Sequence, residues 1–222
     1  MKIDILTLFP KMFSGPFEES IVKRAQEKSL VKINIHDLRK WGLTERRTVD
    51  DRPYSGGAGM LLRVDVIDNA LKDLRTKKNK NTKTILLDAA GKKFTQQKAL
   101  QLTKVDQLIL IAGHYEGVDH RVHEHLVDEI ISIGDYVLTG GEIPAMVVVD
   151  TIVRLLPGVI KPESLSEESF SSLKIENCKL EINAEYPQYT RPEIYRGWKV
   201  PKVLLSGNHK DINKWKKEKS TA

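Results

Sequence analysis

The chain has 222 residues, of which 40% are hydrophobic and 30% charged, and its formal net charge is +6. This size and balance predict a globular protein with one sizeable core, or with a main domain and a smaller appendage. No apolar run approaches the roughly 20 residues that a membrane-spanning helix needs. The lone Cys178 excludes an internal disulfide and fits a reducing compartment. We therefore expect a cytoplasmic protein that does not bind a membrane.

Strand patterns and helix patterns alternate along the first 133 residues. The strand patterns cover residues 3–5, 31–35, 84–87, 107–111 and 129–133. The helix patterns, with apolar residues three or four positions apart, cover residues 17–25, 64–74, 95–102 and 118–126. Strands that alternate with helices predict an α/β fold with a mainly parallel sheet that is covered on both faces.

The composition changes twice after residue 133. Residues 144–156 predict a helix that is apolar nearly all round and is therefore buried, either in the core or between subunits. Residues 161–172 are rich in Ser and Glu and predict a mobile linker or lid. We therefore expect a main domain at 1–160, a linker at 161–182 and a basic C-terminal domain at 183–222.

The positive charge is concentrated at the C-terminal end. From Tyr186 onward, nine Lys and Arg residues stand against three acidic residues, so this tail alone carries a formal +6. Aromatic residues are interleaved with these charges, namely Tyr186, Tyr189, Tyr195, Trp198 and Trp215. Such a mixture is typical of contact with nucleic-acid phosphates and bases. A solvated helix face explains residues 214–219 nearly as well.

Two glycine-bearing loops follow predicted strands. One is AGHYEGVD at residues 112–119, and the other is GDYVLTGG at residues 134–141, just before the apolar helix. Ligands of open α/β sheets bind at the C-terminal ends of the strands, and glycine lets the backbone come close to a ligand. We therefore predict that these two neighbouring strand ends form one small-molecule site.

Two other clusters indicate no site by themselves. The glycine-rich segment at residues 54–60 lacks the Gly-Lys-Ser/Thr of a P-loop and the dinucleotide fingerprint, so an ordinary turn is the simplest interpretation. The four histidines at positions 114, 120, 123 and 125 lack a zinc-binding spacing, which favours structural or solvent-exposed roles. We predict no resident metal site, and the sequence leaves a requirement for Mg²⁺ open.

Several segments together resemble one family. They are ILTLFP at residues 5–10, DDRPYSGGAGM at 50–60, both glycine-bearing loops, YTRP at 189–192 and PKVLLSGNH at 201–209. Essentially the whole chain is in register with the bacterial tRNA (guanine-N1)-methyltransferases of the SPOUT class. The resemblance implies methylation of guanine N1 in tRNA by S-adenosylmethionine, at the guanosine immediately 3′ to the anticodon.

The resemblance also implies a trefoil-knotted α/β domain that holds S-adenosylmethionine in a bent shape, a small, mostly helical C-terminal domain, and a homodimer in which both subunits build each active site. Backbone groups of residues 133–138 would read the adenine edge. The implied cofactor-binding residues are Leu86, Leu87, Gly113, Ser132, Ile133, Gly134, Asp135, Tyr136, Val137, Leu138, Gly140, Gly141 and Pro144. At residues 88–90 the sequence Asp-Ala-Ala departs from the common Ser-Pro-Gln, so the contacts around the ribose stay unassigned.

The residues implied at the target guanine lie in two segments. Glu116 could accept hydrogen bonds from the N1–H and the N2 amine of guanine, although a helix N-terminal acid would look the same. The resemblance favours contact between Glu116 and the guanine. It also implies that Gly59 and Tyr115 lie at the guanine and that Asp50 and Arg52 shape the guanine pocket.

Methylation of N1 also requires a base and a group that stabilises charge on O6. The family's proposed base is an Asp followed by Ser-Phe, and Glu168 takes that place here, with Glu167 as a competitor. Arg154 is the matching partner for O6. Without the resemblance, Glu168 would be a solvated linker acid and Arg154 an ion-pair partner of Asp150.

Two other classes of function compete with this interpretation. A noncatalytic RNA-binding or ribosome-assembly protein could share the fold, but it would not need Glu168, Arg154 and the complete loop. A nucleotide-dependent oxidoreductase would need a fingerprint and an acidic ribose partner that the chain lacks. We therefore expect a tRNA methyltransferase.

Overall fold

The computed structural model describes the chain except residues 55, 76–80, 167–168, 170–173, 177–178, 182–184 and 221–222. It divides into two compact units, residues 1–160 and residues 161–222, and each is considered by itself. The predicted bases Glu167 and Glu168, and also Cys178, lie outside the described residues.

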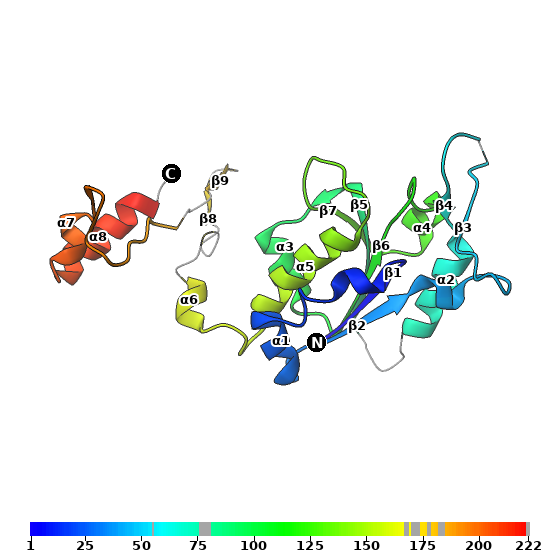
Figure 1. Cartoon of the computed structure of the whole chain (residues 1–222), viewed down its shortest axis with the longest axis horizontal. Coiled ribbons are helices and arrows are strands. Elements are labelled where there is room, and N and C mark those ends of the chain that lie inside the picture. The colour runs from blue at the N-terminus through cyan, green and yellow to red at the C-terminus, as the bar shows by residue number, and fades with distance from the viewer. Residues whose placement is uncertain are drawn as a thin grey trace. The chain divides into compact units, whose positions relative to one another are not determined.

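The first unit is built on a sheet of five parallel strands in the order β2-β1-β6-β5-β7 (Figure 1). The strands are β1 (Lys2–Thr7), β2 (Lys32–Asp37), β5 (Thr82–Lys93), β6 (Gln107–Ala112) and β7 (Glu129–Ser132). A separate two-stranded pair joins β3 (Asp50–Asp51) to β4 (Leu61–Leu62). The prediction of an α/β fold with a mainly parallel sheet is confirmed.

Helices cover both faces of this sheet (Figure 1). The helices are α1 (Ser20–Glu27), α2 (Val64–Leu74), α3 (Gln96–Leu102), α4 (His120–His125) and α5 (Glu142–Arg154), with short 3-10 turns η1 (Pro10–Phe13) and η2 (Leu38–Trp41). One core cluster joins α1, α3 and α5 to the sheet, and the other joins α2 and α4 to it.

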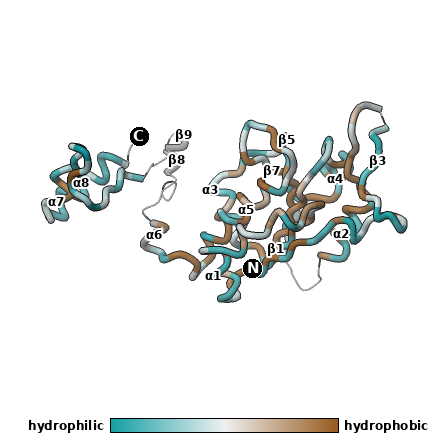
Figure 2. Tube along the Cα trace, viewed as in Figure 1, coloured by the Kyte–Doolittle hydropathy of each residue, from teal (hydrophilic) through white to brown (hydrophobic). Residues whose placement is uncertain are grey.

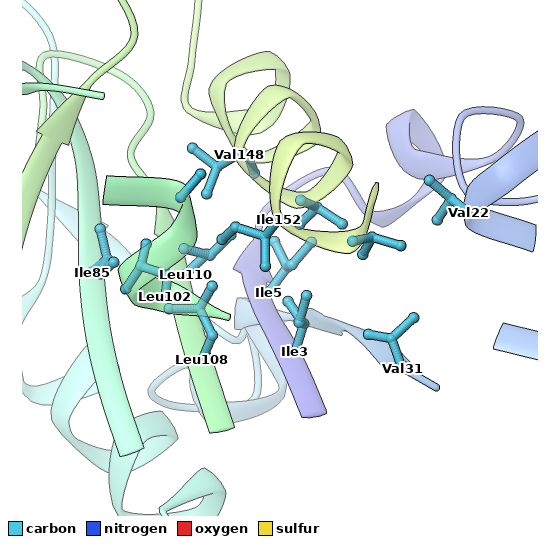
Figure 3. Close-up of a cluster of buried hydrophobic side chains, with 14 of the residues drawn as sticks. Ile3, Ile5, Val22, Val31, Ile85, Leu102, Leu108, Leu110, Val148 and Ile152 are labelled. Carbon is cyan, nitrogen blue, oxygen red and sulfur yellow. The ribbon is translucent and has the colours of Figure 1, made fainter. Parts of the chain in front are cut away.

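The strands divide their side chains between these two clusters because successive side chains point to opposite faces. On β6, Leu108 and Leu110 face α5, whereas Ile109 and Ile111 face α2, and all four are fully buried. Figure 3 shows the first cluster, in which Ile152 of α5 lies over the strands. Figure 2 shows hydrophobic segments gathered in this sheet. The near-continuous apolar strands are what a sheet covered on both faces requires.

Several elements differ from their predicted bounds; helix α1, for example, begins at Ser20 and not at residue 17. Helix α5 begins at Glu142, two residues before Pro144, and its inner face is buried while Ile143 and Val147 are 45% and 41% exposed. Within one chain the helix is therefore buried on one face only, and burial of the other face between subunits stays a prediction. Strand β5 runs to Lys93, and a bulge lets both Leu87 and Lys92 pair with Ile131. Residues 88–93, which read DAAGKK, lack the apolar pattern of a buried strand, so the sequence did not predict this extension.

The second unit has small elements. They are α6 (Pro162–Ser166), β8 (Lys174–Glu176), β9 (Lys179–Glu181), β10 (Ile194–Tyr195), β11 (Trp198–Lys199), α7 (Lys202–Leu205) and α8 (His209–Ser220). Strands β8 and β9 form one antiparallel pair, and β10 and β11 form another. The segment predicted as a linker therefore carries a helical turn and a strand pair.

A buried carboxylate ties three strands of the first unit together. Asp4 on β1 is fully buried and accepts hydrogen bonds from Asn34 and Gln107 at 2.9 and 2.7 Å, while His36 and Lys2 each lie 2.8 Å from its oxygens. Burial raises its pKa, but these four polar contacts, led by His36, outweigh burial and lower the pKa from 3.8 to about 2.

This shift makes stability depend on pH. Because the folded pKa of Asp4 lies below its unfolded value, its contribution is complete above about pH 4 and is lost as the pH falls towards about 2. We expect wild-type protein to lose about 2 kcal/mol of unfolding free energy across this window through Asp4. The Asp4→Asn variant should be less stable than wild type near pH 7 by about 3 kcal/mol, and its unfolding free energy should lack this pH-dependent loss. Urea unfolding followed by circular dichroism at several pH values measures both; parallel pH curves would contradict the assignment.

Candidate active site

A cavity opens at the C-terminal ends of β6 and β7 and beside the middle of β5, at residues 87–89. Its empty volume is about 730 Å³, part of it open to solvent. The lining residues are Leu87, Asp88, Ala89, Gly113, His114, Tyr115, Glu116, Gly117, Val118, Ile131, Ser132, Ile133, Gly134, Tyr136, Val137, Leu138, Thr139, Gly140, Gly141 and Pro144. The two strand ends predicted to form one site are not neighbours, because β5 lies between β6 and β7. Their loops nevertheless line the same cavity.

The two loops are joined by their backbones. The N–H of Gly141 donates to the carbonyl of Gly113 at 2.7 Å. A Cβ added to Gly141 would lie 2.6 Å from the Cα of Ala112, a distance that real Cβ atoms do not reach. This close approach explains why glycine stands at position 141.

Most residues predicted to hold the cofactor line this cavity, and two do not. Leu86 is fully buried in the core cluster beneath α2 and α4. The carboxylate of Asp135 pairs with Lys93 at 2.5 Å and is mostly exposed. The side chains of these two residues are therefore directed elsewhere.

The residues predicted at the guanine meet at one edge of the cavity. A Cβ on Gly59 would lie 2.3 Å from the Cγ of Glu116, so the two residues are in direct contact. The N–H of Glu116 donates to the carbonyl of Met60 at 3.1 Å. Helix α4 begins at His120 and is capped by Asp119, so Glu116 lies outside its first turn. A helix N-terminal role therefore does not explain Glu116.

Asp50 and Arg52 lie in the segment that leads to Gly59. Asp50 belongs to β3 and pairs with Leu62. Arg52 lines a second cavity, together with Tyr54 and Arg121. The structure therefore connects this segment to Glu116 through Gly59 and Met60, whereas Arg52 lines the second cavity and not the first.

Comparison with known proteins decides the family. A family model described as tRNA (Guanine-1)-methyltransferase TrmD matches residues 1–222. The chain belongs to this family. A tRNA (guanine-N(1)-)-methyltransferase of Alkaliphilus metalliredigens is 51% identical over 99% of this chain and 87% of the relative. Those of Chloroflexus aurantiacus and Bacillus pumilus are each 49% identical, over 98% and 99% of this chain and 82% and 87% of the relatives. The resemblance found in the sequence is thereby confirmed.

Arg154 lies far from the cavity of its own chain. It is the last residue of α5, whereas Pro144 near the start of the helix lines the cavity. Ten residues of α-helix span about 15 Å. Arg154 and the cavity-lining part of α5 therefore lie at opposite ends of this helix.

Sequence reasoning assigned no role to some residues at the cavity. Asp88 lines it and accepts from the N–H of Ala90 at 2.8 Å, and His123 Nε2 lies 3.4 Å from its second oxygen. His114 lines the cavity beside Tyr115. The departure from the family pattern at Asp88 was visible in the sequence, but its pairing with His123 depends on the fold. Among the described residues, no group of three or more potential metal ligands occurs.

The close backbone contact at Gly141 between the two loops of the cavity can be tested by substitution. Gly141→Ala should lower the unfolding free energy by about 1–3 kcal/mol, because its Cβ would push the loops apart. Gly113→Ala is the matched control, since its Cβ would meet only ordinary contacts at 3.5 Å. Urea denaturation of both variants measures the difference, and equal stabilities would contradict the close approach.

Proposed function

We propose that this chain transfers a methyl group from S-adenosylmethionine to guanine N1 in tRNA, at the guanosine immediately 3′ to the anticodon. The observation that carries the proposal is the cavity built from two glycine loops, with Glu116 at its edge, in a chain that matches the methyltransferase family over its whole length. No helix long and apolar enough to cross a membrane occurs in the described part of the chain. The tRNA substrate would place the reaction in the cytoplasm.

The cavity fits an adenosine-containing methyl donor. Where Gly113 and Gly117 line it, an added Cβ would meet no atom of the chain closer than 3.5 Å, and Leu138 and Ile133 supply apolar walls. Backbone groups of residues 133–138 can read the adenine edge, while the carboxylate of Asp88 can accept from ribose hydroxyls. The bound donor supplies a methyl group on a positively charged sulfur. The trefoil thread around this ligand stays a prediction.

The guanine would bind at the edge formed by Gly59, Tyr115 and Glu116. Before N1 loses its proton, the carboxylate of Glu116 can accept from both N1–H and the N2 amine, a pattern that other bases do not present; after the transfer it keeps the bond from N2. Glu168 would take the N1 proton while N1 bonds to the methyl carbon and the sulfur–carbon bond breaks. Arg154 would stabilise the negative charge that develops on O6.

A homodimer would bring Arg154 to the guanine. The outer face of α5 exposes Ile143 and Val147, and the neighbouring turn η1 exposes Met12. An apolar face of this kind is typical of a surface that another chain covers. Two copies packed antiparallel through α5 would place Arg154 of each beside the cavity of its partner.

The second unit would bind tRNA. Its basic residues are accompanied by exposed aromatic rings at Tyr189, Tyr195 and Trp198. Rings of this kind can stack on unpaired bases, while Lys and Arg bind phosphates.

The proposed reaction can be tested with purified protein, tRNA transcripts and methyl-labelled S-adenosylmethionine. We expect the label in 1-methylguanosine at the position 3′ to the anticodon, identified by nuclease digestion and mass spectrometry. A transcript with adenosine at that position is the matched control and should take up no label. Parallel reactions with MgCl₂ and with EDTA decide the Mg²⁺ requirement. Tight tRNA binding without label would favour the noncatalytic RNA-binding protein.

A further inference from the structure

A buried acid behind the cavity has no part in the reaction described so far. Glu142 is only 1% exposed, stands in the GGEIP segment and does not line the cavity. The hydroxyl of Thr7, the last residue of β1, donates to its Oε1 at 2.8 Å. The N–H of Phe9 donates in turn to the Thr7 oxygen at 2.9 Å. This carboxylate is thus held in one orientation by a strand end.

The second oxygen of Glu142 faces a histidine of the cavity wall. Glu142 Oε2 lies 3.8 Å from Nδ1 of His114, and this nitrogen is buried without a hydrogen-bond partner in the described part of the chain. The His114 ring packs against Phe9 and Tyr115, with centroids 4.7 and 5.2 Å apart. A Cβ on Gly140 would lie 2.6 Å from Nδ1, so the loop closes over this contact.

The electrostatics of the contact select one form of the ring. A carboxylate facing the lone pair of an imidazole nitrogen repels it, whereas a proton on that nitrogen makes the interaction attractive. Which ring nitrogen carries the proton is set by the partner of the other one. Glu142 therefore favours the proton on Nδ1 of His114, and the Nε2 of a neutral ring is left as an acceptor.

We propose that Glu142 is a positioning residue that fixes this tautomer of His114, so that Nε2 accepts a hydrogen bond from an N–H or O–H group of a ligand in the cavity. The ligand role rests on the proposed function, whereas the tautomer depends on the protein alone. The methyl donor and the guanine both carry such groups, and separate binding measurements distinguish them.

Long-range ¹⁵N–¹H correlation spectra of the histidine rings test the tautomer directly. The full-length protein is used without ligands at about pH 8, above the ordinary histidine pKa of about 6.5. We expect wild-type His114 to show a protonated Nδ1. In Glu142→Gln the amide oxygen can accept from Thr7 and the NH₂ then faces Nδ1, so the spectrum should change to the Nε2–H form. An Nε2–H tautomer in wild type, or one unchanged in the variant, would overturn the proposal.

Two controls separate positioning from general damage. Asp4 is also a buried carboxylate beside a histidine, with its oxygen 2.8 Å from His36, but it lies outside the cavity. Asp4→Asn should leave the His114 spectrum unchanged. Thr7→Val removes the hydroxyl that holds Glu142 and should not preserve the wild-type His114 spectrum. Thr7→Ser keeps the hydroxyl and should preserve that spectrum. A His114 spectrum that changes equally in Asp4→Asn and Glu142→Gln would contradict the proposal.

Binding and turnover then identify the ligand. Glu142→Gln should lower the affinity for one ligand by about tenfold, as expected for loss of a partner that orients a binding group. Calorimetry with S-adenosylmethionine reports on the methyl donor, and the KM for tRNA reports on the guanine. If neither the affinity for S-adenosylmethionine nor the KM for tRNA changes, His114 does not contact a ligand, and the ligand role in the proposal is wrong. Absence of methyl transfer by wild-type protein would instead contradict the proposed function and would leave the tautomer result standing.

Discussion

Glu168→Gln should lower the turnover of tRNA methylation by about a hundredfold or more, the scale expected for loss of a positioned general base. The amide keeps the size of the carboxyl group but cannot take the N1 proton of guanine. All the residues described as lining the proposed cofactor cavity belong to the first unit, so affinity for S-adenosylmethionine should persist. Single-turnover methylation and calorimetry on the same protein measure the two quantities.

Two neighbouring substitutions serve as controls. Glu168→Asp restores the family's usual residue and should keep appreciable activity, because the base remains with a shorter reach. Glu167→Gln should have a small effect. Full activity in Glu168→Gln, together with a large loss in Glu167→Gln, would transfer the role of base to Glu167.

Mixing variants tests whether two chains build one site. Arg154→Ala should also be nearly inactive, because charge on O6 would lose its partner. If Arg154 and Glu168 of one site come from different chains, a heterodimer of the two variants has one intact site. Random exchange of subunits should then restore roughly a quarter of the wild-type activity. A mixture that stays inactive under proven exchange would exclude the shared site.

Local patterns in the sequence were sufficient for the sheet and most of its helices. The strands at 107–111 and 129–133 are apolar runs bounded by polar residues, and such runs depend little on distant contacts. The start of α5 was misplaced because Pro144 is favoured in the first turn of a helix, whereas Gly141 supplies the cap. The order of the strands, with β5 inserted between the two glycine loops, is set by tertiary packing.

In the candidate site, too, some residues could be predicted from local sequence, whereas others are brought together only by the fold. Gly113 and most of residues 133–141 could be predicted to line the cavity because the strand ends and glycines that mark them are adjacent in sequence. The contact between Gly59 and Glu116 joins residues 57 positions apart, so only the family resemblance could bring them together. Glu142 is separated from Thr7 by 135 positions, and nothing local to either residue indicates their hydrogen bond.

The second large effect concerns tRNA affinity, which should depend strongly on salt through the second unit. Each phosphate contact contributes about 0.7–0.9 to the slope of log affinity against log salt. Four residues are proposed to contact phosphates, namely Arg191, Lys199, Lys214 and Lys216. Lys214 lies 4.0 Å from Glu218, and Lys216 lies over the Tyr186 ring at 4.4 Å.

Replacing all four by Gln should weaken tRNA binding at low salt by at least about tenfold and reduce the slope by up to about 3. Filter binding at several KCl concentrations measures both. A control protein with the same net charge carries Gln at exposed lysines of the first unit, namely Lys23, Lys28, Lys32 and Lys104. This control should keep most of the slope, because bulk charge is screened beyond about 10 Å at 0.1 M salt. If the tail variant keeps the wild-type slope, the basic tail serves only solubility; if the control loses as much, the effect is one of net charge.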